Sequence, residues 1–559
     1  MSEFHPTTSD APGPVTMFGP DFPFPYDDWL RHPAGLGTLP PEAHGGSVAV
    51  IGAGLAGMVA AYELMELGLR PVVYEPARIG GRLRSHEFEG SSGVIAELGG
   101  MRFPISGTSF FHYADRLGLE HRPFPNPLTE HAGSTVIDVG GTTFYGRVLE
   151  DLPPQFAEIS DAWDAALEEI GFSAIQTAIR ARDVKALKAA WDELVPVWDG
   201  RTFYDFLASS TSFAGLPFRS REMFGLVGFG TGGWDSDFPN SMLEILRVVL
   251  TNCDADQMLM VDGVERLPRG LWELPVSERS PWPAGTTLAS LHGGVPRPGV
   301  AAIRRADDGR FDVRDRWGTT RQHHAVVATC QSWLLTTQID CEESLFSQDL
   351  WMALDRTRYM QSSKTFVMVD EPFWKKPDPV TGRDLMSMTL TDRLTRGTYL
   401  FDNGDASPSV ICLTYSWMSD ALKMLPYDVE RRVELSLDAL GKIYPGLDIA
   451  GHIVGDPVTV SWEDDPNFLG AFKGALPGHY RYNHRMYTHF MQERLPATER
   501  GIFLAGDDVS FTPAWAEGAV QTALNAVWGV LAHFGGSCSP DNPGPGDRFD
   551  ELAPIDLGE

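Results

Sequence analysis

The chain has 559 residues, 43% of them hydrophobic, and its 45 basic and 75 acidic residues give a formal net charge of −30 at pH 7. This length predicts about two to four domains with a large apolar core. Nucleic acid is excluded as an expected partner, because neutralising phosphates needs a basic face. The five cysteines are widely spaced and form no C-x-x-C or Cys/His pattern, so we expect neither a metal site nor a disulfide framework.

The first residues, MSEFHPTTSDAPGPVTMFGPDF, have neither a basic start nor an apolar core, so no signal peptide is expected. The longest uncharged apolar stretch, residues 47–62, is too short to span a bilayer. Few cysteines also suit a reducing compartment. We therefore expect a cytoplasmic protein that does not enter a membrane. Residues 1–46, rich in proline, glycine and aromatic residues, predict an irregular arm on the body or on a neighbouring subunit of a homo-oligomer.

Residues 47–75 have the form of a βαβ dinucleotide-binding unit. A β-branched run leads into Gly52-Ala53-Gly54-x-x-Gly57, then a helix and a second strand that ends at Glu75. The first glycine allows a tight turn, and Gly54 lets the backbone approach a pyrophosphate at the helix N-terminus. Gly57 lets the helix lie close to the sheet. Glu75, with Ala77 just beyond it, is the expected partner of the adenosine ribose.

Two more glycine-rich blocks follow the acid. They contain, in chain order, Gly80-Gly81-Arg82-Leu83-Arg84-Ser85 and Leu98-Gly99-Gly100-Met101-Arg102-Phe103-Pro104. Together with the first fingerprint they strongly resemble the flavin amine oxidase superfamily, which includes the monoamine and L-amino acid oxidases. The resemblance implies FAD as cofactor, with Gly81, Arg82 and residues 99–102 on its flavin side. Arg82 also has a physical reason to be there, as a charge-assisted partner for phosphate.

A closing block supports the same family. Gly506-Asp507 follows a short strand, and Trp515-Ala516-Glu517-Gly518-Ala519 opens a helix. Asp507 can accept hydrogen bonds from the ribityl hydroxyls. The helix that begins near Trp515 would direct its positive end at the flavin N1–C2 carbonyl and stabilise the reduced ring. The resemblance also places Trp462 and the backbone of Val264 at the cofactor; Val264 stands where the family has a second glycine.

The expected fold class is α/β: a Rossmann-like FAD-binding domain of the flavin amine oxidase type with an inserted α+β substrate-binding domain. Helical periodicity over 155–170, 174–190 and 241–250 predicts a helical part of the inserted domain. The expected boundaries are an arm at 1–46; FAD-binding segments at 47–129, 256–334 and 496–535; a helical substrate segment at 130–255; a substrate sheet at 335–495; and a C-terminal tail at 536–559.

Three residues are implied to act at the reacting centre. Lys364 shares a strand face with Phe366 and Met368, so it is expected to point inward, where the family's lysine holds a water against flavin N5. Arg102 matches the arginine that pairs with the substrate carboxylate in amino-acid-oxidising members, which also orients the Cα–H. Trp515 is the third, and it is also expected to contact substrate.

Within the superfamily the closest resemblance is to bacterial amino acid 2-monooxygenases, the group that acts on tryptophan or lysine, and it covers about residues 47–535. Tyr415 matches a second carboxylate ligand, and Trp417, Cys253 and Phe472 are implied to line the pocket. The run Trp234-Asp235-Ser236-Asp237-Phe238 departs from the tryptophan type. A carboxylate there can bind the distal ammonium of lysine or ornithine; Asp237 is the first candidate and Asp235 the second, against an ordinary N-cap or solvated turn.

The resemblance thus implies oxidative decarboxylation of L-lysine with O2 to 5-aminopentanamide, CO2 and water, by hydride transfer from Cα to flavin N5. One alternative is an L-amino acid oxidase of basic amino acids that releases H2O2, ammonia and a 2-keto acid. Another is a flavin-binding module without turnover, which the retained Arg102, Lys364 and Tyr415 oppose. The same residues serve both enzymatic outcomes, and pocket closure decides between them.

Overall fold

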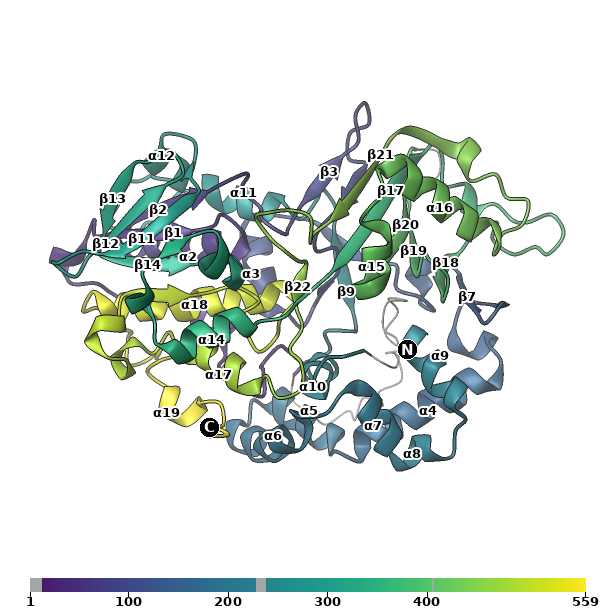
Figure 1. The fold of residues 1–559 in the computed structure, drawn as a ribbon, viewed down its shortest axis with the longest axis horizontal. Helices are drawn as coiled ribbons and strands as arrows, with labels where there is room; N and C mark the ends of the chain where they lie inside the picture. The colour runs from purple at the N-terminus through teal and green to yellow at the C-terminus, as the bar shows by residue number, and fades with distance from the viewer. Residues whose placement is uncertain (1–12, 228–237, 405–406, 559) are drawn as a thin grey trace.

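The computed structural model describes residues 13–227, 238–404 and 407–558. Figure 1 shows two halves side by side, each built on a sheet, with the N- and C-terminal parts of the chain both contributing to the left half.

The left half is built on a five-stranded parallel sheet in the order β10-β2-β1-β14-β23. Its strands are β1 (Ser47–Ile51), β2 (Arg70–Glu75), β10 (Arg297–Pro298), β14 (Ala325–Ala328) and β23 (Ile502–Leu504). Strand side chains alternate between two faces, so Val48 and Val50 join one apolar cluster while Ala49 and Ile51 join another. Both faces of this sheet are therefore covered, which is the arrangement that a parallel sheet requires.

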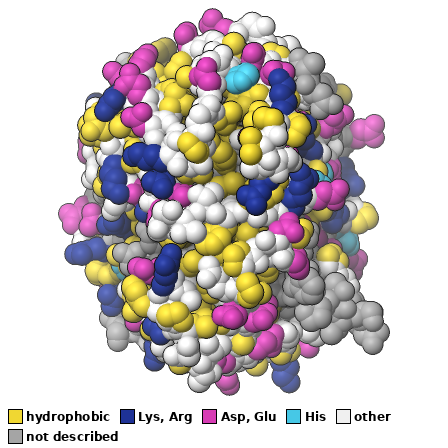
Figure 2. Space-filling view, turned by 90° about the vertical axis from the view of Figure 1, so that its right-hand side faces the viewer, with side chains coloured by type: hydrophobic (Ala, Val, Ile, Leu, Met, Phe, Trp, Pro, Cys, Tyr) yellow, Lys and Arg dark blue, Asp and Glu magenta, His cyan; other side chains and the backbone are white. Residues whose placement is uncertain are grey.

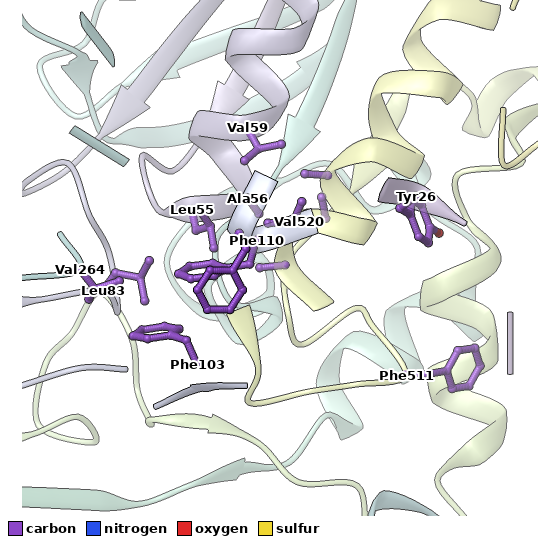
Figure 3. Close-up of a cluster of buried hydrophobic side chains, with 14 of the residues drawn as sticks. Tyr26, Leu55, Ala56, Val59, Leu83, Phe103, Phe110, Val264, Phe511 and Val520 are labelled. Carbon is purple, nitrogen blue, oxygen red and sulfur yellow. The ribbon is translucent and has the colours of Figure 1, made fainter. Parts of the chain in front are cut away.

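One face is covered by α2 (Leu55–Glu66) and α18 (Ala516–His533). Residues 55–65 of α2 are all buried, so this helix is apolar all round because it lies between the sheet and other helices. Figure 3 shows Leu55, Ala56 and Val59 of α2 beside Val520 of α18. Close by, the rings of Phe103 and Phe110 stack with centroids 4.7 Å apart. This contact joins β5 (Phe103–Pro104) to α3 (Thr108–Arg116).

The other face carries a second sheet and three helices. The sheet has the order β13-β12-β11-β15, and its strands are β11 (Val300–Arg305), β12 (Phe311–Asp315), β13 (Thr320–His323) and β15 (Asp340–Cys341). The helices are α13 (Ser332–Thr337), α14 (Gln348–Arg356) and α17 (Tyr480–Thr488), and their side chains belong to this apolar cluster. α14 and α17 lie in residues 335–495, the segment expected to form the substrate sheet, and α13 crosses the boundary of that segment. An apolar sheet face has to be covered, and here helices from later in the chain cover it.

The right half contains a seven-stranded sheet in the order β21-β17-β20-β19-β18-β7-β8. Its strands are β17 (Ser362–Val369), β18 (Met388–Thr391), β19 (Gly397–Phe401), β20 (Ser409–Trp417), β21 (Ile453–Ser461), β7 (Thr135–Val139) and β8 (Thr142–Gly146). The last two strands lie in the segment expected to be helical. β7 pairs in parallel with β18, with Val136 opposite Thr389, so a distant strand supplies the partner that makes this short segment extended. Helices α15 (Met418–Met424) and α16 (Val429–Gly441) pack against the sheet.

Helices below this sheet complete the right half (Figure 1). They are α4 (Pro154–Glu168), α5 (Phe172–Ala181), α6 (Val184–Trp198), α7 (Phe203–Ser209), α8 (Thr211–Ala214), α9 (Phe218–Val227) and α10 (Met242–Leu250). The single helix expected over 174–190 is in fact two. Arg182 ends α5 in a left-handed conformation (φ 51°), and the carboxylate of Asp183 caps α6 by accepting from the Ala186 N–H. A local cap thus interrupts a continuous apolar period.

Smaller elements connect the halves. A three-stranded sheet in the order β5-β9-β6 contains β9 (Gln257–Met260) and β6 (His121–Pro123), and two-stranded ribbons pair β3 (Ser85–Glu87) with β4 (Ile95–Glu97) and β16 (Tyr359–Met360) with β22 (Phe472–Lys473). Helices α11 (Arg266–Glu273) and α12 (Leu288–His292) pack on the left half.

The N-terminal arm, with α1 (Tyr26–Arg31), lies on the body of the same chain. Its aromatic residues between Phe18 and Trp29 are buried, and the Tyr26 hydroxyl donates to Asn525 Oδ1 of α18 at 2.7 Å. The C-terminal tail packs with it: α19 (Phe549–Leu552) brings Phe549 to within 5.9 Å of the Phe22 ring. Aromatic residues that the periodicity could not place therefore join the two ends of the chain.

The surface carries mixed charge. On the face shown in Figure 2, basic and acidic side chains are interspersed around apolar ones, with no continuous basic patch. Among the described residues, no helix is both long and apolar enough to cross a bilayer.

Candidate active site

A long cavity runs between the two halves, enclosing about 1510 Å³ including its open mouth. Its walls come from the first βα turn, the glycine-rich blocks, β17, β20 and the start of α18. Most residues expected at a cofactor line it: Gly52, Gly54, Glu75, Gly81, Arg82, Gly99, Gly100, Arg102, Trp462, Gly506, Asp507, Trp515 and Ala516. Tertiary structure thus brings together blocks that are several hundred residues apart.

The glycines of the first turn are required by space. A Cβ on Gly57 would lie 2.0 Å from the carbonyl oxygen of Gly52, and Gly52 itself has a positive φ of 109°. A Cβ on Gly81 would lie 3.0 Å from the Cα of Gly54. Without side chains there, α2 begins directly at the cavity, and its N-cap Gly54 provides no side-chain cap. The free N–H groups at this helix end suit a phosphate.

Glu75 lies at the end of β2, where the sequence placed it. Its carboxylate accepts from the backbone N–H groups of Ala53 at 2.9 Å, Ala77 at 2.9 Å and Arg78 at 3.2 Å. Burial raises the pKa of this carboxyl, while those N–H groups act in the opposite direction. Ala53 and Ala77 thus hold the acid in place through their backbone and do not line the cavity.

Val264, which was expected to meet the cofactor through its backbone, does not line the cavity. Val264 is fully buried, and its N–H donates to the Glu97 carboxylate at 2.8 Å, so it is not at the cavity. Gly299 and Val300 line the cavity beside Glu75 instead. The sequence motif around Val264 was misassigned because a glycine turn before a helix also suits a buried carboxylate acceptor. A glycine directly before a strand, as Gly299 stands before β11, is the sequence signal that could have found this part of the wall.

Two residues predicted to bind cofactor also bind each other. The Arg82 guanidinium forms an ion pair with Asp507, including a bond from Nη1 at 3.1 Å, and Nη1 also donates to the Ala471 carbonyl at 3.0 Å. Asp507 further accepts from the Ala514 N–H at 3.2 Å. This pair fixes the glycine-rich block at residues 80–85 relative to the closing block at Gly506-Asp507, so both side chains are held in place at the cavity wall.

Helix α18 begins at the cavity as expected. Trp515 is its N-cap and supplies no side-chain cap, and Ala514 before it adopts a left-handed φ of 70°. Glu517, in the first turn, accepts instead from the N–H groups of Ser109 at 3.2 Å and Phe110 at 2.7 Å. Burial raises the pKa of Glu517 to about 7. The helix end therefore faces the cavity with open N–H groups, while its acid caps α3.

Lys364 lies inside the protein and lines the long cavity. Its ammonium donates to the carbonyl oxygens of Glu97, at 3.1 Å, and Gly99, and it lies 4.8 Å from the centre of the Tyr415 ring. Burial lowers the pKa of Lys364 to about 8. With two donors on carbonyls, a third remains for a water or other acceptor in the cavity.

A side cavity of about 1020 Å³ joins the long one. The residues that line both are Gly99, Gly100, Arg102, Tyr415, Phe472, Ala514 and Trp515. Trp417 and Met101 line the side cavity alone. Residues expected at the cofactor and at the substrate thus meet at one junction.

Arg102 stands at this junction within three aromatic rings. Its guanidinium carbon lies 5.6 Å from the ring centre of Phe124, 5.9 Å from Tyr399 and 5.8 Å from Tyr415. No salt bridge of Arg102 is found among residues 13–227, 238–404 and 407–558. Burial raises the pKa of Tyr415, and the Arg102 charge acts against that shift. The junction therefore offers a fixed cation and a neutral hydroxyl to an incoming anion.

One expected substrate residue does not line either cavity. Cys253 is fully buried, with its sulfur 3.1 Å from the Thr251 hydroxyl, and it lines neither cavity. Its neighbour Asp254 lines the side cavity instead. Asp237 and Asp235 lie outside the described residues.

Metal ligands were not expected, but the described residues do contain one group with suitable spacing. Asp370, Glu371 and His452 lie together at an exposed edge of the right half, and they line neither cavity. The cavities themselves bring together glycines, open helix N-termini, an acid at the ribose position and an Arg–Asp pair, all of which suit a dinucleotide.

Comparisons with known proteins agree with this geometry. Residues 55–531 match the family model described as flavin containing amine oxidoreductase. Tryptophan 2-monooxygenase of Pseudomonas savastanoi is 30% identical over 541 residues, which cover 91% of this chain and 93% of that protein. The flavin-dependent L-tryptophan oxidase RebO of Lentzea aerocolonigenes is 27% identical, covering 87% and 98%. Among solved structures, cyclohexylamine oxidase from Brevibacterium oxydans is similar in fold, with a TM-score of 0.63 at 17% identity over 88% of this chain and 99% of that one.

Proposed function

Since this chain belongs to the flavin-containing amine oxidoreductase family, we propose that it is an FAD-dependent amino acid 2-monooxygenase whose substrate is L-lysine. The reaction is L-lysine plus O2 to 5-aminopentanamide, CO2 and water. The observation that carries the amino-acid assignment is the Arg102 guanidinium, which lies at the junction of the two cavities within a cage of aromatic rings.

FAD is the proposed form of the flavin because the long cavity offers a place for each part of a dinucleotide. Glu75 suits the adenosine ribose, the start of α2 suits the pyrophosphate, and the start of α18 suits the flavin ring. When bound, FAD supplies the acceptor for the Cα hydride and passes the electrons to O2.

Substrate binding is assigned to Arg102 and Tyr415. A guanidinium fork binds a carboxylate through two hydrogen bonds, and the Tyr415 hydroxyl adds a third. Both line the junction, so a carboxylate bound there would lie where the two cavities meet, beside the start of α18. Phe472 and Trp515, which line the same junction, exclude water from the reacting carbon.

Lys364 is proposed to hold a water or oxygen species at the reacting centre. Two of its donors are on carbonyl oxygens, and its lowered pKa near 8 leaves it charged at neutral pH and able to release a proton above it. No side-chain base is needed for Cα if the α-amine arrives neutral.

Lysine as the substrate rests on the sequence. The run at 234–238 has acids where the tryptophan type has apolar residues. Asp237 remains our candidate residue for binding the distal ammonium, and Asp235 is the second. Ornithine is the alternative substrate. The acidic net charge of −30 favours the approach of a cationic substrate.

An L-amino acid oxidase that releases H2O2 is the second candidate. It is favoured by the match to an L-tryptophan oxidase that covers 87% of this chain, and the same anchor residues serve it. We also propose that the protein is a homo-oligomer located in the cytoplasm.

A product assay decides between these functions. Purified holoenzyme is incubated with L-lysine in air without catalase, and products are identified by mass spectrometry. 5-Aminopentanamide as the main product supports the proposal. Keto acid with ammonia and peroxide makes the protein an oxidase, and no flavin bleaching by any amino acid under anaerobic conditions would leave a binding module.

A further inference from the structure

A carboxylate of the N-terminal arm reaches the wall of the side cavity from behind. Asp21 is 2% exposed, and it accepts two hydrogen bonds from Arg247 of α10, at 2.7 Å from Nε and 2.9 Å from Nη2. The indole Nε1 of Trp191 donates to the same carboxylate at 3.0 Å. Arg247 lines the side cavity, whereas Asp21 does not. The arm thus places a negative charge directly behind a residue of the cavity wall.

Arg247 is held at this wall by its surroundings. Its side chain is buried, and Nη1 donates to the Glu244 carboxylate at 3.2 Å. The ring centres of Trp191 and Phe511 lie 5.5 and 5.1 Å from its guanidinium carbon. Two carboxylates and two rings therefore fix the position of the guanidinium, and water screens its charge little because the group is buried.

The charged side chains along the side cavity do not balance without the arm. Among the lining residues that the structure describes, three are basic and two are acidic, namely Arg102, Arg247, Lys473, Glu244 and Asp254. Burial lowers the pKa of Lys473 to about 8, so this lysine is charged at neutral pH. The lining by itself therefore carries one net positive charge, which the Asp21 carboxylate cancels through its ion pair with Arg247.

We propose that Asp21 is a specificity-determining residue, which neutralises Arg247 and so allows a substrate with a cationic side chain to occupy the side cavity. Asp21 lies behind the wall and acts through Arg247, so it is a positioning residue. This inference rests on the proposed function, since it presumes that the substrate carries a distal ammonium into this cavity. Phe238, the described end of the run at 234–238, lines the side cavity, which is why the distal charge is placed there.

Substitution of Asp21 in the holoenzyme tests this inference. We compare kcat/KM for L-lysine and for L-norleucine, which has the same chain without the terminal ammonium. Asp21→Asn is close in shape to the wild type but leaves one positive charge of the wall without compensation. It is expected to lower the lysine-to-norleucine ratio about tenfold, the scale of one unit charge about 10 Å away at an effective dielectric constant of about 20. The value for norleucine itself should stay unchanged.

Asp27→Asn is the matched control. Asp27 is a buried carboxylate of the same arm, and it accepts from Nη2 of Arg182 at 2.9 and 3.0 Å. It lines neither cavity. This variant removes an equivalent ion pair away from the side cavity, so it should keep the wild-type ratio.

A double variant separates the charge of Asp21 from its structural contacts. In Asp21→Asn/Arg247→Met the uncompensated guanidinium is removed as well, so the wall and the arm together are neutral again. The double variant should therefore recover most of the lysine-to-norleucine ratio that the single variant loses. A purely structural role predicts the opposite, because the double variant loses more contacts than the single one.

The outcomes separate this inference from the proposed substrate. If the wild type prefers lysine and Asp21→Asn leaves the ratio unchanged, the inference is overturned while the proposed function stands. Equal losses for both substrates, or a double variant no better than the single one, overturn it as well. No preference of the wild type for lysine overturns both. If Asp21→Asn does not retain flavin, Glu244→Gln, which removes the other carboxylate partner of Arg247, must lower the ratio, and an unchanged ratio there overturns the inference.

Discussion

Replacing Arg102 by methionine tests the anchor of the active site. The guanidinium lies within a cage of three rings, 5.6 to 5.9 Å from their centres, and methionine fills a similar apolar volume there. If Arg102 binds the substrate carboxylate as proposed, the variant loses two hydrogen bonds to a charged group, worth about 1.5 to 3 kcal/mol each. The total of roughly 3 to 6 kcal/mol corresponds to a fall in kcat/KM of about 10²- to 10⁴-fold.

The assay measures flavin bleaching by L-lysine under anaerobic conditions, which isolates the reductive step. 1,5-Diaminopentane, which lacks the carboxylate, is tested beside it as a competitive inhibitor. Arg102→Met should lower kcat/KM for lysine and leave the inhibition constant of the diamine unchanged. Arg122→Met, at an exposed arginine of β6 that donates to the Asp402 carbonyl, controls for loss of a positive charge. An equal loss for lysine and the diamine would refute the carboxylate role of Arg102.

Three further predictions concern the cofactor site and its surroundings. Lys364→Met should slow reoxidation of the reduced protein by O2 at least about tenfold. Because the pKa of Lys364 is near 8, the wild-type reoxidation rate should fall as pH rises through 8. A stopped-flow pH series in which the variant shows the same fall in rate would contradict this role. Gly57→Ala should yield protein with little bound flavin, since the new Cβ would lie 2.0 Å from the Gly52 carbonyl; normal flavin absorbance per chain would disprove the close contact. Burial raises the pKa of Glu517 from 4.5 to about 7, so between these pH values the folded state keeps a proton that the unfolded state releases. The free energy of unfolding therefore has its full value below pH 4.5 and falls as pH rises through 7. The Tm of Glu517→Gln minus that of wild type should increase from pH 5 to pH 8, and a constant difference would contradict the raised pKa.

The cofactor half was largely predictable because its determinants are local. One turn and one helix–strand contact require the glycines Gly52, Gly54 and Gly57, and the next strand ends at Glu75. Spacing alone therefore placed these residues. The start of α18 was predictable for the same reason, because Trp515 and the small residues after it mark a helix that opens without a side-chain cap. The misassignment of Val264 shows the limit of such reasoning. The same local pattern served a buried carboxylate, Glu97, that only the fold brought within 2.8 Å.

Other features depended on partners that are remote in sequence. β7 is a strand because β18, some 250 residues later, pairs with it. Helices α14 and α17 cover the second face of the five-stranded parallel sheet because that apolar face has to be buried. The pairing of Arg82 with Asp507 joins blocks more than 400 residues apart. Periodicity records how one segment distributes its own side chains, and it contains no information on which other segment will meet them.

The amino-acid sequence by itself determined the dinucleotide fingerprint and, through the closing block, the resemblance to the family. Each of these is set by contacts within one turn, strand or helix. The tertiary structure alone decided that Arg102, Tyr415, Phe472 and Trp515 meet at one junction, that Cys253 is buried behind the wall, and that Asp254 and Gln257 face the side cavity. A binding site is a convergence of side chains in space, and that convergence is fixed by the packing of the two halves.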